Sequence, residues 1–388
     1  MNEIINDYHE LHRKAEVGFE LDETVKYVEK RLDEIKVKHT RIGKNGITAT
    51  LGKGEYCILL RADMDALPIR EQTDLPYACK NGNMHACGHD AHTAMLLGAA
   101  KWLKEQEKDL KCTVKLLFQP AEELLEGAKN MLDCGILESP RVDAAAMLHI
   151  VVGTELENGS AIISSAGISA PAVDYFRITL SGKGTHGSTP EKGRDPLALG
   201  CRIALAFEEI RAKELGATEK AMITVGSLHA GKAPNVIPNT AELSGSIRSY
   251  EENTRRYIKN RIEKISDGYS NAFEIEGSVD YYSGAPALVN DEKMSEYALL
   301  CAKKALGEDK AFTSAELSSK SGGGSEDFAY ISEKVPSVMI ALCVGKASDG
   351  YIYPLHHPKF RLDENALACG TALLCEMMMG NLEKIIAD

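Results

Sequence analysis

Residues 84–105 read MHACGHDAHTAMLLGAAKWLKE. Apolar residues recur with a period of 3.6 from residue 91 to residue 105, which predicts an amphipathic helix with Asp90 as its N-cap. Short apolar runs of strand length lie on both sides of this helix: 56–62 (YCILLRA), 114–118 (VKLLF) and 143–148 (DAAAML). A further helix is predicted at 24–35. Because buried parallel strands read as continuous apolar runs, this alternation predicts a mixed, mostly parallel sheet covered by helices on both faces.

The pattern changes near Pro171. The next segment predicts the order strand, helix, strand, strand, helix, strand, which is the ferredoxin-like arrangement. Its predicted elements are 175–181, 196–215, 221–228, 241–249, 253–266 and 273–281. A helix, a glycine-rich loop, a strand and a last helix follow at 292–306, 321–325, 337–344 and 364–383. The predicted fold class is therefore an α/β domain, residues 1–171 and 287–388, interrupted by a smaller α+β domain, residues 172–286.

Composition and charge argue against several classes of protein. The chain has 388 residues, and its 45 Lys+Arg against 57 Asp+Glu give a net charge of −12. This charge argues against a nucleic-acid groove or a membrane-surface protein, because both require a basic face. No apolar run approaches the roughly 18 residues of a membrane span, and residues 1–10 do not resemble a signal peptide. The stretches 182–184 and 322–324 lack the spacing of a phosphate loop. We predict a cytoplasmic protein with mostly buried, reduced cysteines.

Residues that can bind metals or transfer protons cluster around the predicted strand ends. Cys87 and His89 are two positions apart, so they point the same way in extended backbone, and thiolate with imidazole suits zinc and the later first-row metals. Three strand ends carry further such residues: Asp63 and Asp65, Glu122 and Glu123, and His149. Each alone has an ordinary explanation as a cap, a solvated acid or a structural histidine. Their coincidence favours a site, because sites in parallel sheets form beyond the carboxyl ends of the strands.

Other residues are weaker candidates for the same site. His356 and His357 lie in a loop after the last predicted strand, and the residues alone do not distinguish them. In the predicted inserted domain, His186 lies in a glycine-rich turn, Asn235 begins the stretch NVIP, and Arg248 lies near a strand end. A turn residue or a surface charge would explain each of these three side chains equally well.

Seven motifs, in this order along nearly the whole chain, resemble the amidohydrolase branch of the aminoacylase/carboxypeptidase metallopeptidase family. They are RADMDALP (61–68), MHACGHDAHTAMLLGAA (84–100), FQPAEE (118–123), HGS (186–188), NVIP (235–238), SEDF (325–328) and LHHPKF (355–360). The branch contains hippurate hydrolase, N-acyl-amino-acid amidohydrolases, indoleacetyl-amino-acid hydrolases and N-acetyldiaminopimelate deacetylase. The stretch YHELHRKAEVGFEL (8–21) also resembles the N-terminal helix of the branch, although KAE stands where HPE is usual.

The resemblance implies two divalent metal ions per subunit, of Zn, Mn, Co or Ni, with Cys87 as the bridging ligand. The implied ligands are Cys87, His89, Glu123, His149 and His356, the last because LHHP matches the family's Leu-His-x-Pro. Glu122 matches the catalytic carboxylate. The inserted domain is implied to act as a lid and to form a homodimer, with His186 reaching the active site of the partner subunit. Asn235 and Arg248 match positions that hold the substrate carboxylate.

These parts imply hydrolysis of the amide bond of an N-acyl L-amino acid, with an acetyl, benzoyl or similar acyl group. A pair of metals can activate one water and polarise the carbonyl, while Glu122 moves the proton to the leaving amine. His186 would stabilise the oxyanion, and Asp65 and Asp90 would orient metal ligands or serve as turn caps. The alternatives are a metallo-dipeptidase or carboxypeptidase, an N-acetyldiaminopimelate deacetylase, a cysteine hydrolase with Cys87 as nucleophile, and a non-catalytic binding protein.

Overall fold

The computed structural model describes residues 2–317 and 324–380. These residues form two compact units. The first consists of residues 2–169, 288–317 and 326–380, and the second consists of Ala170–Ala287 with residues 324 and 325. Most of the predicted glycine-rich loop at 321–325 lies outside the described residues. Within the described ranges, no helix is both long enough and apolar enough to span a bilayer.

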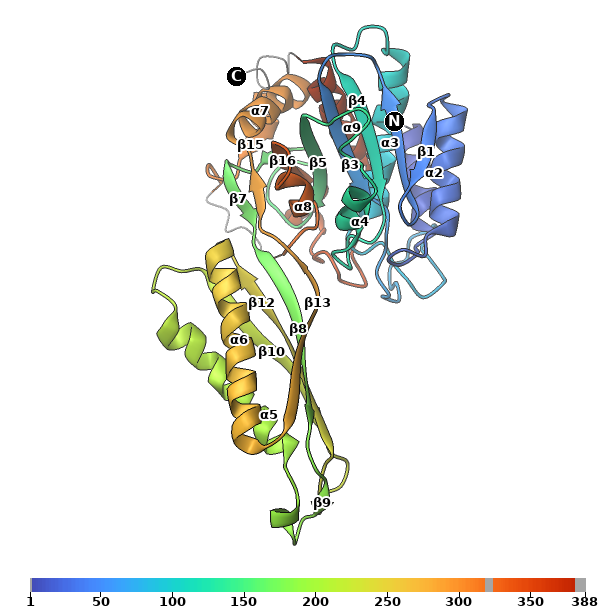
Figure 1. The fold of residues 1–388 in the computed structure, drawn as a ribbon. Coiled ribbons are helices and arrows are strands. Elements are labelled where there is room, and N and C mark those ends of the chain that lie inside the picture. The colour runs from blue at the N-terminus through green and yellow to red at the C-terminus, as the bar shows by residue number, and fades with distance from the viewer. Residues whose placement is uncertain (1, 318–323, 381–388) are drawn as a thin grey trace. The chain divides into compact units, whose positions relative to one another are not determined.

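An eight-stranded sheet forms the centre of the first unit (Figure 1). Its strand order is β1-β2-β4-β3-β5-β16-β6-β15. The strands are β1 (His39–Ile42), β2 (Gly46–Leu51), β3 (Cys57–Asp63), β4 (Thr113–Gln119), β5 (Ala144–Val151), β6 (Ala161–Ile163), β15 (Ala311–Thr313) and β16 (Ser337–Cys343). The central strands β4, β3, β5 and β16 run parallel, whereas β1–β2, β2–β4 and β16–β6 pair antiparallel. The predicted mixed, mostly parallel sheet is confirmed.

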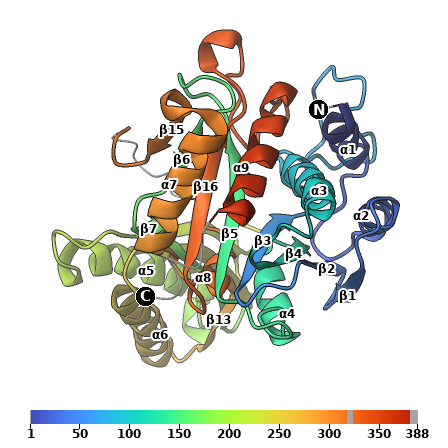
Figure 2. The same cartoon turned by 90° about the horizontal axis from the view of Figure 1, so that it is seen from above.

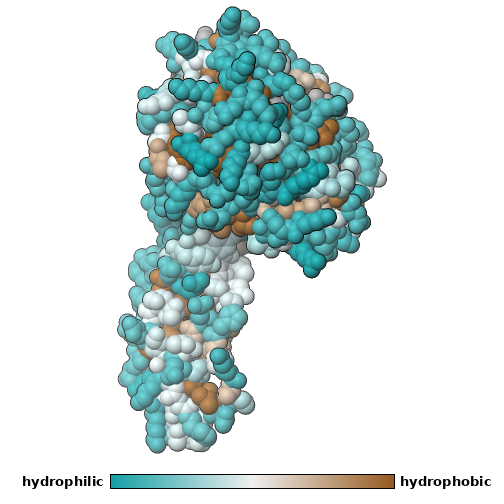
Figure 3. All heavy atoms as spheres, turned by 90° about the vertical axis from the view of Figure 1, so that its right-hand side faces the viewer, coloured by the Kyte–Doolittle hydropathy of each residue, from teal (hydrophilic) through white to brown (hydrophobic). Residues whose placement is uncertain are grey.

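Helices cover both faces of this sheet, with α3, α7 and α9 on one face and α4 and α8 on the other (Figure 2). The helices of the unit are α1 (Asn2–His12), α2 (Asp22–Glu34), α3 (His89–Glu105), α4 (Gly127–Asp133), α7 (Glu292–Leu306), α8 (Ala329–Ser332) and α9 (Leu367–Met379). β3 and β4 are buried along their whole length, which explains why each reads as an unbroken apolar run. The face of the unit seen in Figure 3 is mostly hydrophilic, with apolar side chains exposed only in small patches.

The start of α3 differs from the prediction. The helix begins at His89, and Gly88, with a left-handed φ of 82°, is its N-cap. Asp90 lies inside the first turn, so the prediction that it caps the helix was wrong. The left-handed φ favours glycine at this position, and a Cβ on Gly88 would also lie 2.1 Å from Cδ1 of Ile150 and force that side chain to move. This glycine turns the chain from the loop that carries Cys87 directly into the helix.

Three other boundaries were predicted incorrectly. His149 lies within β5 rather than after it, because β5 continues to Val151 where it pairs with β16. Helix α1 ends at His12, so most of the 8–21 stretch is not helical. The last helix, α9, follows a short 3-10 turn at Glu364–Ala366, and residues 381–383 of the predicted helix lie outside the described residues.

The second unit is a four-stranded antiparallel sheet with two helices packed on one face. Its elements are β8 (Ala172–Ser181), α5 (Pro196–Glu209), β10 (Ala221–Ala230), β12 (Thr240–Ser249), α6 (Glu252–Phe273) and β13 (Glu276–Ala285). The strand order β10-β12-β8-β13 confirms the ferredoxin-like arrangement. Asp195 caps α5 by accepting from the backbone N–H groups of Leu197 and Ala198. Two predicted ends were wrong: α5 stops at Glu209 before a π-helical turn, and α6 continues to Phe273.

Candidate active site

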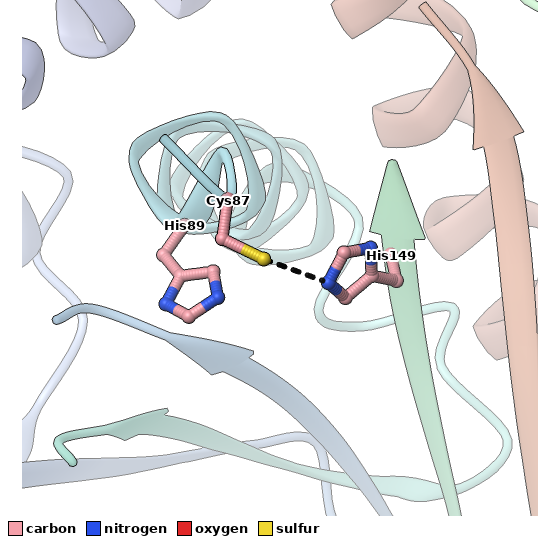
Figure 4. Close-up of side chains that lie close together, drawn as sticks. All are labelled: Cys87, His89 and His149. Atoms are coloured by element: carbon pink, nitrogen blue, oxygen red, sulfur yellow. Dashed lines mark hydrogen bonds between the residues drawn. The ribbon is translucent and has the colours of Figure 1, made fainter. Parts of the chain in front are cut away.

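The residues implied as metal ligands meet beyond the carboxyl ends of the central strands of the first unit. Figure 4 shows three of them: Cys87 from the loop before α3, His89 from the first turn of α3, and His149 from β5. Their ligand-type atoms lie within 4.8 Å of one another. Cys87, Glu123 and His356 form a second group with the same spacing. The structure therefore brings all five residues together, and Cys87 belongs to both groups.

His149 presents one ring nitrogen to Cys87. Its Nδ1 donates a hydrogen bond to the carbonyl oxygen of Ile150 at 2.7 Å, so the lone pair is on Nε2. That Nε2 lies 3.6 Å from Sγ of Cys87. Burial raises the pKa of the Cys87 thiol to about 12, and burial also lowers the pKa of His149. The metal-free pair is therefore a thiol and a neutral imidazole.

The structure distinguishes His356 from its neighbour His357. Nε2 of His356 lies 3.4 Å from Oε1 of Glu123, and this carboxylate raises the pKa of His356. The backbone of His356 adopts a left-handed φ of 65°, and its N–H donates to the carbonyl oxygen of Ala86 at 2.8 Å. His357 instead stacks on Tyr353 with ring centroids 4.5 Å apart. Only His356 therefore belongs to the cluster.

The atoms of the cluster fit divalent cations. Both ring nitrogens of His89 and Oε1 of Glu123 are buried and have no hydrogen-bond partner. Two ligand atoms of one tetrahedral cation lie about 3.5 Å apart for sulfur and nitrogen and about 3.4 Å apart for oxygen and nitrogen, given the usual metal–ligand distances. The observed separations are 3.6 Å from Cys87 to His149 and 3.4 Å from Glu123 to His356. Sulfur, imidazole and carboxylate together are donors that zinc and later first-row metals accept.

Asp65 contacts both His89 and the segment that carries Glu122 and Glu123. Its carboxylate oxygens accept from the backbone N–H groups of Glu122 at 3.0 Å and Glu123 at 3.1 Å. Oδ1 of Asp65 also lies 3.4 Å from Nδ1 of His89, which leaves Nε2 of that histidine toward the cluster centre. Asp65 is fully buried, so these contacts restrict both the backbone of the glutamates and the ring of His89.

Glu122 differs from Glu123 in its surroundings. Both carboxylates lie near Nε2 of His89, at 3.8 Å for Oε2 of Glu122 and 3.9 Å for Oε1 of Glu123, so the difference lies in their other neighbours. Burial, together with the carboxylates of Glu326 and Asp327, raises the pKa of Glu122 well above its usual value. A carboxyl group that holds its proton more readily than usual, and that lies within 4.8 Å of the ligand atoms of His89 and Glu123, is suited to accept a proton and pass it on.

His92 is a residue of this site that sequence reasoning missed. Its Nε2 accepts from the backbone N–H of Ile150 at 3.0 Å, so its Nδ1 carries the proton and donates to Asp63 at 2.6 Å. Both nitrogens are therefore used, and His92 has no lone pair left for a metal. It ties β5, next to His149, to the end of β3. The signal was present, because His92 follows His89 by three residues and so lies on the same helix face.

Asp90 does not contact the cluster. Its carboxylate accepts from Nδ1 of His12 at 2.6 Å and from the backbone N–H of Ala91. Nε2 of His12 lies 3.2 Å from Glu71. The expectation that Asp90 orients a metal ligand is thus not met by any direct contact, and Asp90 instead anchors α1 to the first turn of α3.

Three further predicted residues lie in the second unit. His186 belongs to the short strand β9 (Thr185–His186), which pairs with β11 (Val236–Ile237). Asn235 precedes β11, and its carbonyl oxygen accepts from the N–H of Gly187 at 2.7 Å, so His186 and Asn235 lie close together. His186 is exposed, with Nδ1 2.7 Å from the hydroxyl of Ser188. Arg248 on β12 donates to Oγ of Ser325 at 3.0 Å.

Comparison with known proteins gives the family. Residues 59–380 match the description "Peptidase family M20/M25/M40". The chain belongs to this family. N-acetyl-L-cysteine deacetylase of Bacillus subtilis (strain 168) is 36% identical over 97% of this chain and 89% of its own length. Hippurate hydrolase of Campylobacter jejuni is 33% identical over 97% and 95% of the two chains. A crystal structure of a Bacillus subtilis dinuclear metal-binding M20 peptidase is 30% identical, covers 99% of both chains and superposes with a TM-score of 0.79.

Membership of the M20/M25/M40 family confirms the resemblance that the motifs indicated. The matched region contains every residue of the cluster, from Asp65 to His356. It begins within β3 and therefore leaves out α1 and α2, although the individual relatives align over almost the whole chain. The similarity thus covers both the sheet that supports the site and the inserted second unit.

Proposed function

We propose that this protein is a metal-dependent amidohydrolase. It adds water across the amide bond of an N-acyl L-amino acid, releasing a carboxylic acid and the free amino acid. One observation carries this proposal: thiol, imidazole and carboxylate ligands from five residues converge, with buried atoms of His89 and Glu123 lacking a hydrogen-bond partner, next to one carboxylate, Glu122, that is available for proton transfer. The names of the related deacetylase and hippurate hydrolase support the substrate class.

Two groups of ligands that share Cys87 support a pair of divalent cations. Cys87, His89 and His149 would hold one cation, and Cys87, Glu123 and His356 would hold the other. When bound, such a pair polarises a carbonyl and lowers the pKa of a water molecule. The thiol of Cys87 must lose its proton when it becomes a ligand.

Glu122 performs the proton transfers. Since Glu123 faces His356, Glu122 is free to take the proton of the attacking water and deliver it to the leaving nitrogen. Asp65 keeps the backbone of both glutamates in place, so that adjacent residues fulfil different roles. Burial around Glu122 keeps the proton near the reacting atoms rather than exchanging it with bulk water.

The second unit contributes substrate recognition. Arg248 would bind the amino-acid carboxylate in a fork, which meets the anionic substrate locally although the chain has a net charge of −12. Asn235 would support the same carboxylate, and His186 would donate a hydrogen bond to the developing oxyanion. We further propose a homodimer through this unit, in which His186 acts in the site of the partner subunit.

Metal dependence and a substrate panel test the proposed function. The protein is stripped with a chelator, reloaded with Zn²⁺, Mn²⁺, Co²⁺ or Ni²⁺, and assayed on N-acetyl and N-benzoyl amino acids and on dipeptides. Loss of activity with the chelator and its rescue by a metal are expected, with faster cleavage of the N-acyl amino acids. Chelator resistance combined with inactivation by a thiol reagent would indicate a cysteine hydrolase instead. Faster cleavage of dipeptides would reassign the substrate class to peptides.

A further inference from the structure

Residues 61–63 of the motif RADMDALP and the motif SEDF (325–328) have no role in the proposed function. In the structure they meet in a buried ion cluster of the first unit. Arg61 of β3 is 3% exposed, and an uncompensated guanidinium in that position would be very costly. Its donors reach four oxygen acceptors: Asp63 at 2.6 Å, Asp327 at 2.8 Å, Glu326 at 2.9 Å and Oε1 of Gln119 at 3.0 Å.

Asp327 connects Arg61 to both ends of the segment that carries Glu122 and Glu123. Its carboxylate accepts from Nε2 of Gln119, the last residue of β4, at 2.9 and 3.0 Å. It also accepts from the backbone N–H of Ala128, in the first turn of α4, at 2.8 Å. The two glutamates lie between these two attachment points.

The segment between the attachment points is a tight turn. Ala121 and Leu125 adopt left-handed φ values of 56° and 58°. A Cβ on Gly127 would lie 1.7 Å from the carbonyl oxygen of Pro120, so the turn closes tightly on itself. The hydrogen bonds to Asp65 described above hold its middle. The buried carboxylate of Asp327 thus fixes both ends of the turn, and that of Asp65 fixes its middle. Arg61 is the cation that pairs with Asp327.

We propose that Arg61 is a positioning residue of the active site. Acting through Gln119 and Asp327, it sets the turn so that Glu122 faces the reacting groups and Glu123 stays among the metal ligands. This inference rests on the proposed function for the roles of the two glutamates. The alternative is an ion cluster that only stabilises the sheet. A misplacement of about 1 Å can cost about 10²-fold in rate, so the two possibilities predict different kinetics.

Arg61→Lys and Gln119→Met test the proposal. Lysine keeps the charge of Arg61 but lacks the fork that reaches Gln119 and Asp327 together. Gln119→Met leaves every charge of the cluster in place, so it provides the test if Arg61→Lys does not fold. Lys115→Met is the matched control, because Lys115 lies on β4, as Gln119 does, and is buried. Its ammonium group donates to the carbonyl oxygens of Ile136, Glu138 and Pro140.

The zinc-loaded variants are compared with wild type for kcat, KM, melting temperature and Zn²⁺ affinity by calorimetry. We expect Arg61→Lys and Gln119→Met to lower kcat at least tenfold, to change KM less than about threefold, and to weaken Zn²⁺ binding about tenfold or more. Lys115→Met should keep kcat within about twofold of wild type, even if its melting temperature falls as far as those of Arg61→Lys and Gln119→Met.

Equal kcat losses in Gln119→Met and Lys115→Met at equal losses of melting temperature would overturn the proposal. So would a Gln119→Met enzyme with kcat and Zn²⁺ affinity within twofold of wild type. If wild type cleaves no N-acyl amino acid, the proposed function fails, and Zn²⁺ affinity alone then decides about positioning. Weaker Zn²⁺ binding in Gln119→Met than in Lys115→Met supports the positioning role, and equal Zn²⁺ binding rejects it.

Discussion

Glu122 and Glu123 are adjacent in the chain and share one neighbour, His89, but Glu123 also faces His356. Nε2 of His89 lies 3.8 Å from Oε2 of Glu122 and 3.9 Å from Oε1 of Glu123, and the same Oε1 lies 3.4 Å from Nε2 of His356. In the turn between β4 and α4, the backbone N–H groups of both residues donate to the carboxylate of Asp65. Under the proposed function, Glu123 serves as a metal ligand and Glu122 as the proton carrier.

Exchanging each carboxylate for its amide separates the two roles. Glu122→Gln should bind the full complement of metal but lose at least ~10²-fold in kcat, because it cannot accept a proton. Glu123→Gln should lose metal, since a neutral amide is a poor ligand. Metal analysis of the two proteins, together with turnover of an N-acyl amino acid, checks the pair. Near-normal turnover by Glu122→Gln would remove this residue from the mechanism.

Metal affinity should increase with pH. Burial raises the pKa of the Cys87 thiol to about 12, so at neutral pH the metal-free protein holds a proton that binding must release. Below that pKa, each released proton makes the logarithm of the affinity rise by about one per pH unit. Calorimetry in two buffers with different ionisation enthalpies counts the protons released. Cys87→Ala should release one proton fewer, and an unchanged count would show that the thiol is not a ligand.

The fold was predictable where burial makes the sequence distinctive. β3, β4 and β16 are buried or nearly so and read as apolar runs, and the order of elements in the second unit indicated its topology. The hairpin of β1 and β2 and the short strands β6 and β15 were not predicted, because three to six residues carry too little pattern.

Much of the site was predictable from motifs, but its supporting contacts were not. The family resemblance carried by the motifs named the five residues that the structure brings together around Cys87. The partner of Asp90 is His12, 78 residues away, and Arg61 binds Asp327, 266 residues away. Nothing local in the sequence encodes such long-range pairs. For this reason the prediction for Asp90 stayed open between orienting a metal ligand and capping a turn, and Arg61 was left without a role.

The contact between His12 and Asp90 predicts a pH dependence of stability. Burial would lower the pKa of His12, but its hydrogen bonds to Asp90 and Glu71 outweigh this effect and raise the pKa to about 10. An unfolded histidine titrates near 6.5. The stabilisation is therefore complete below about pH 6.5 and is lost as the pH rises toward 10.

Chemical denaturation of wild type and His12→Gln across this pH range measures the effect. The difference in the free energy of unfolding should be of the order of 3–5 kcal/mol below about pH 6.5 and should shrink toward pH 10. His229→Gln, at an exposed histidine of β10, serves as the control and should leave the wild-type profile unchanged. A difference that stays constant with pH would show that His12 is uncharged in the folded protein.

Mixed subunits test whether His186 acts across a dimer. Dimers of Glu122→Gln have no proton carrier, and dimers of His186→Ala lack the proposed oxyanion donor. If His186 serves the partner subunit, a mixed dimer contains one complete site, built from Glu122 of one subunit and His186 of the other. Random mixing should then restore about one quarter of wild-type kcat, because half of the dimers are mixed and each has one intact site of two.

The mixed-dimer experiment also shows whether His186 acts within its own subunit, and the metal content of His186→Ala shows whether it is a ligand. If His186 acts within its own subunit, both sites of a mixed dimer are defective, and mixing restores nothing above the average of the two parents. Metal content should remain that of wild type in His186→Ala, because the exposed imidazole belongs to the second unit and not to the metal cluster. A fall in bound metal that parallels the fall in kcat would instead make His186 a ligand.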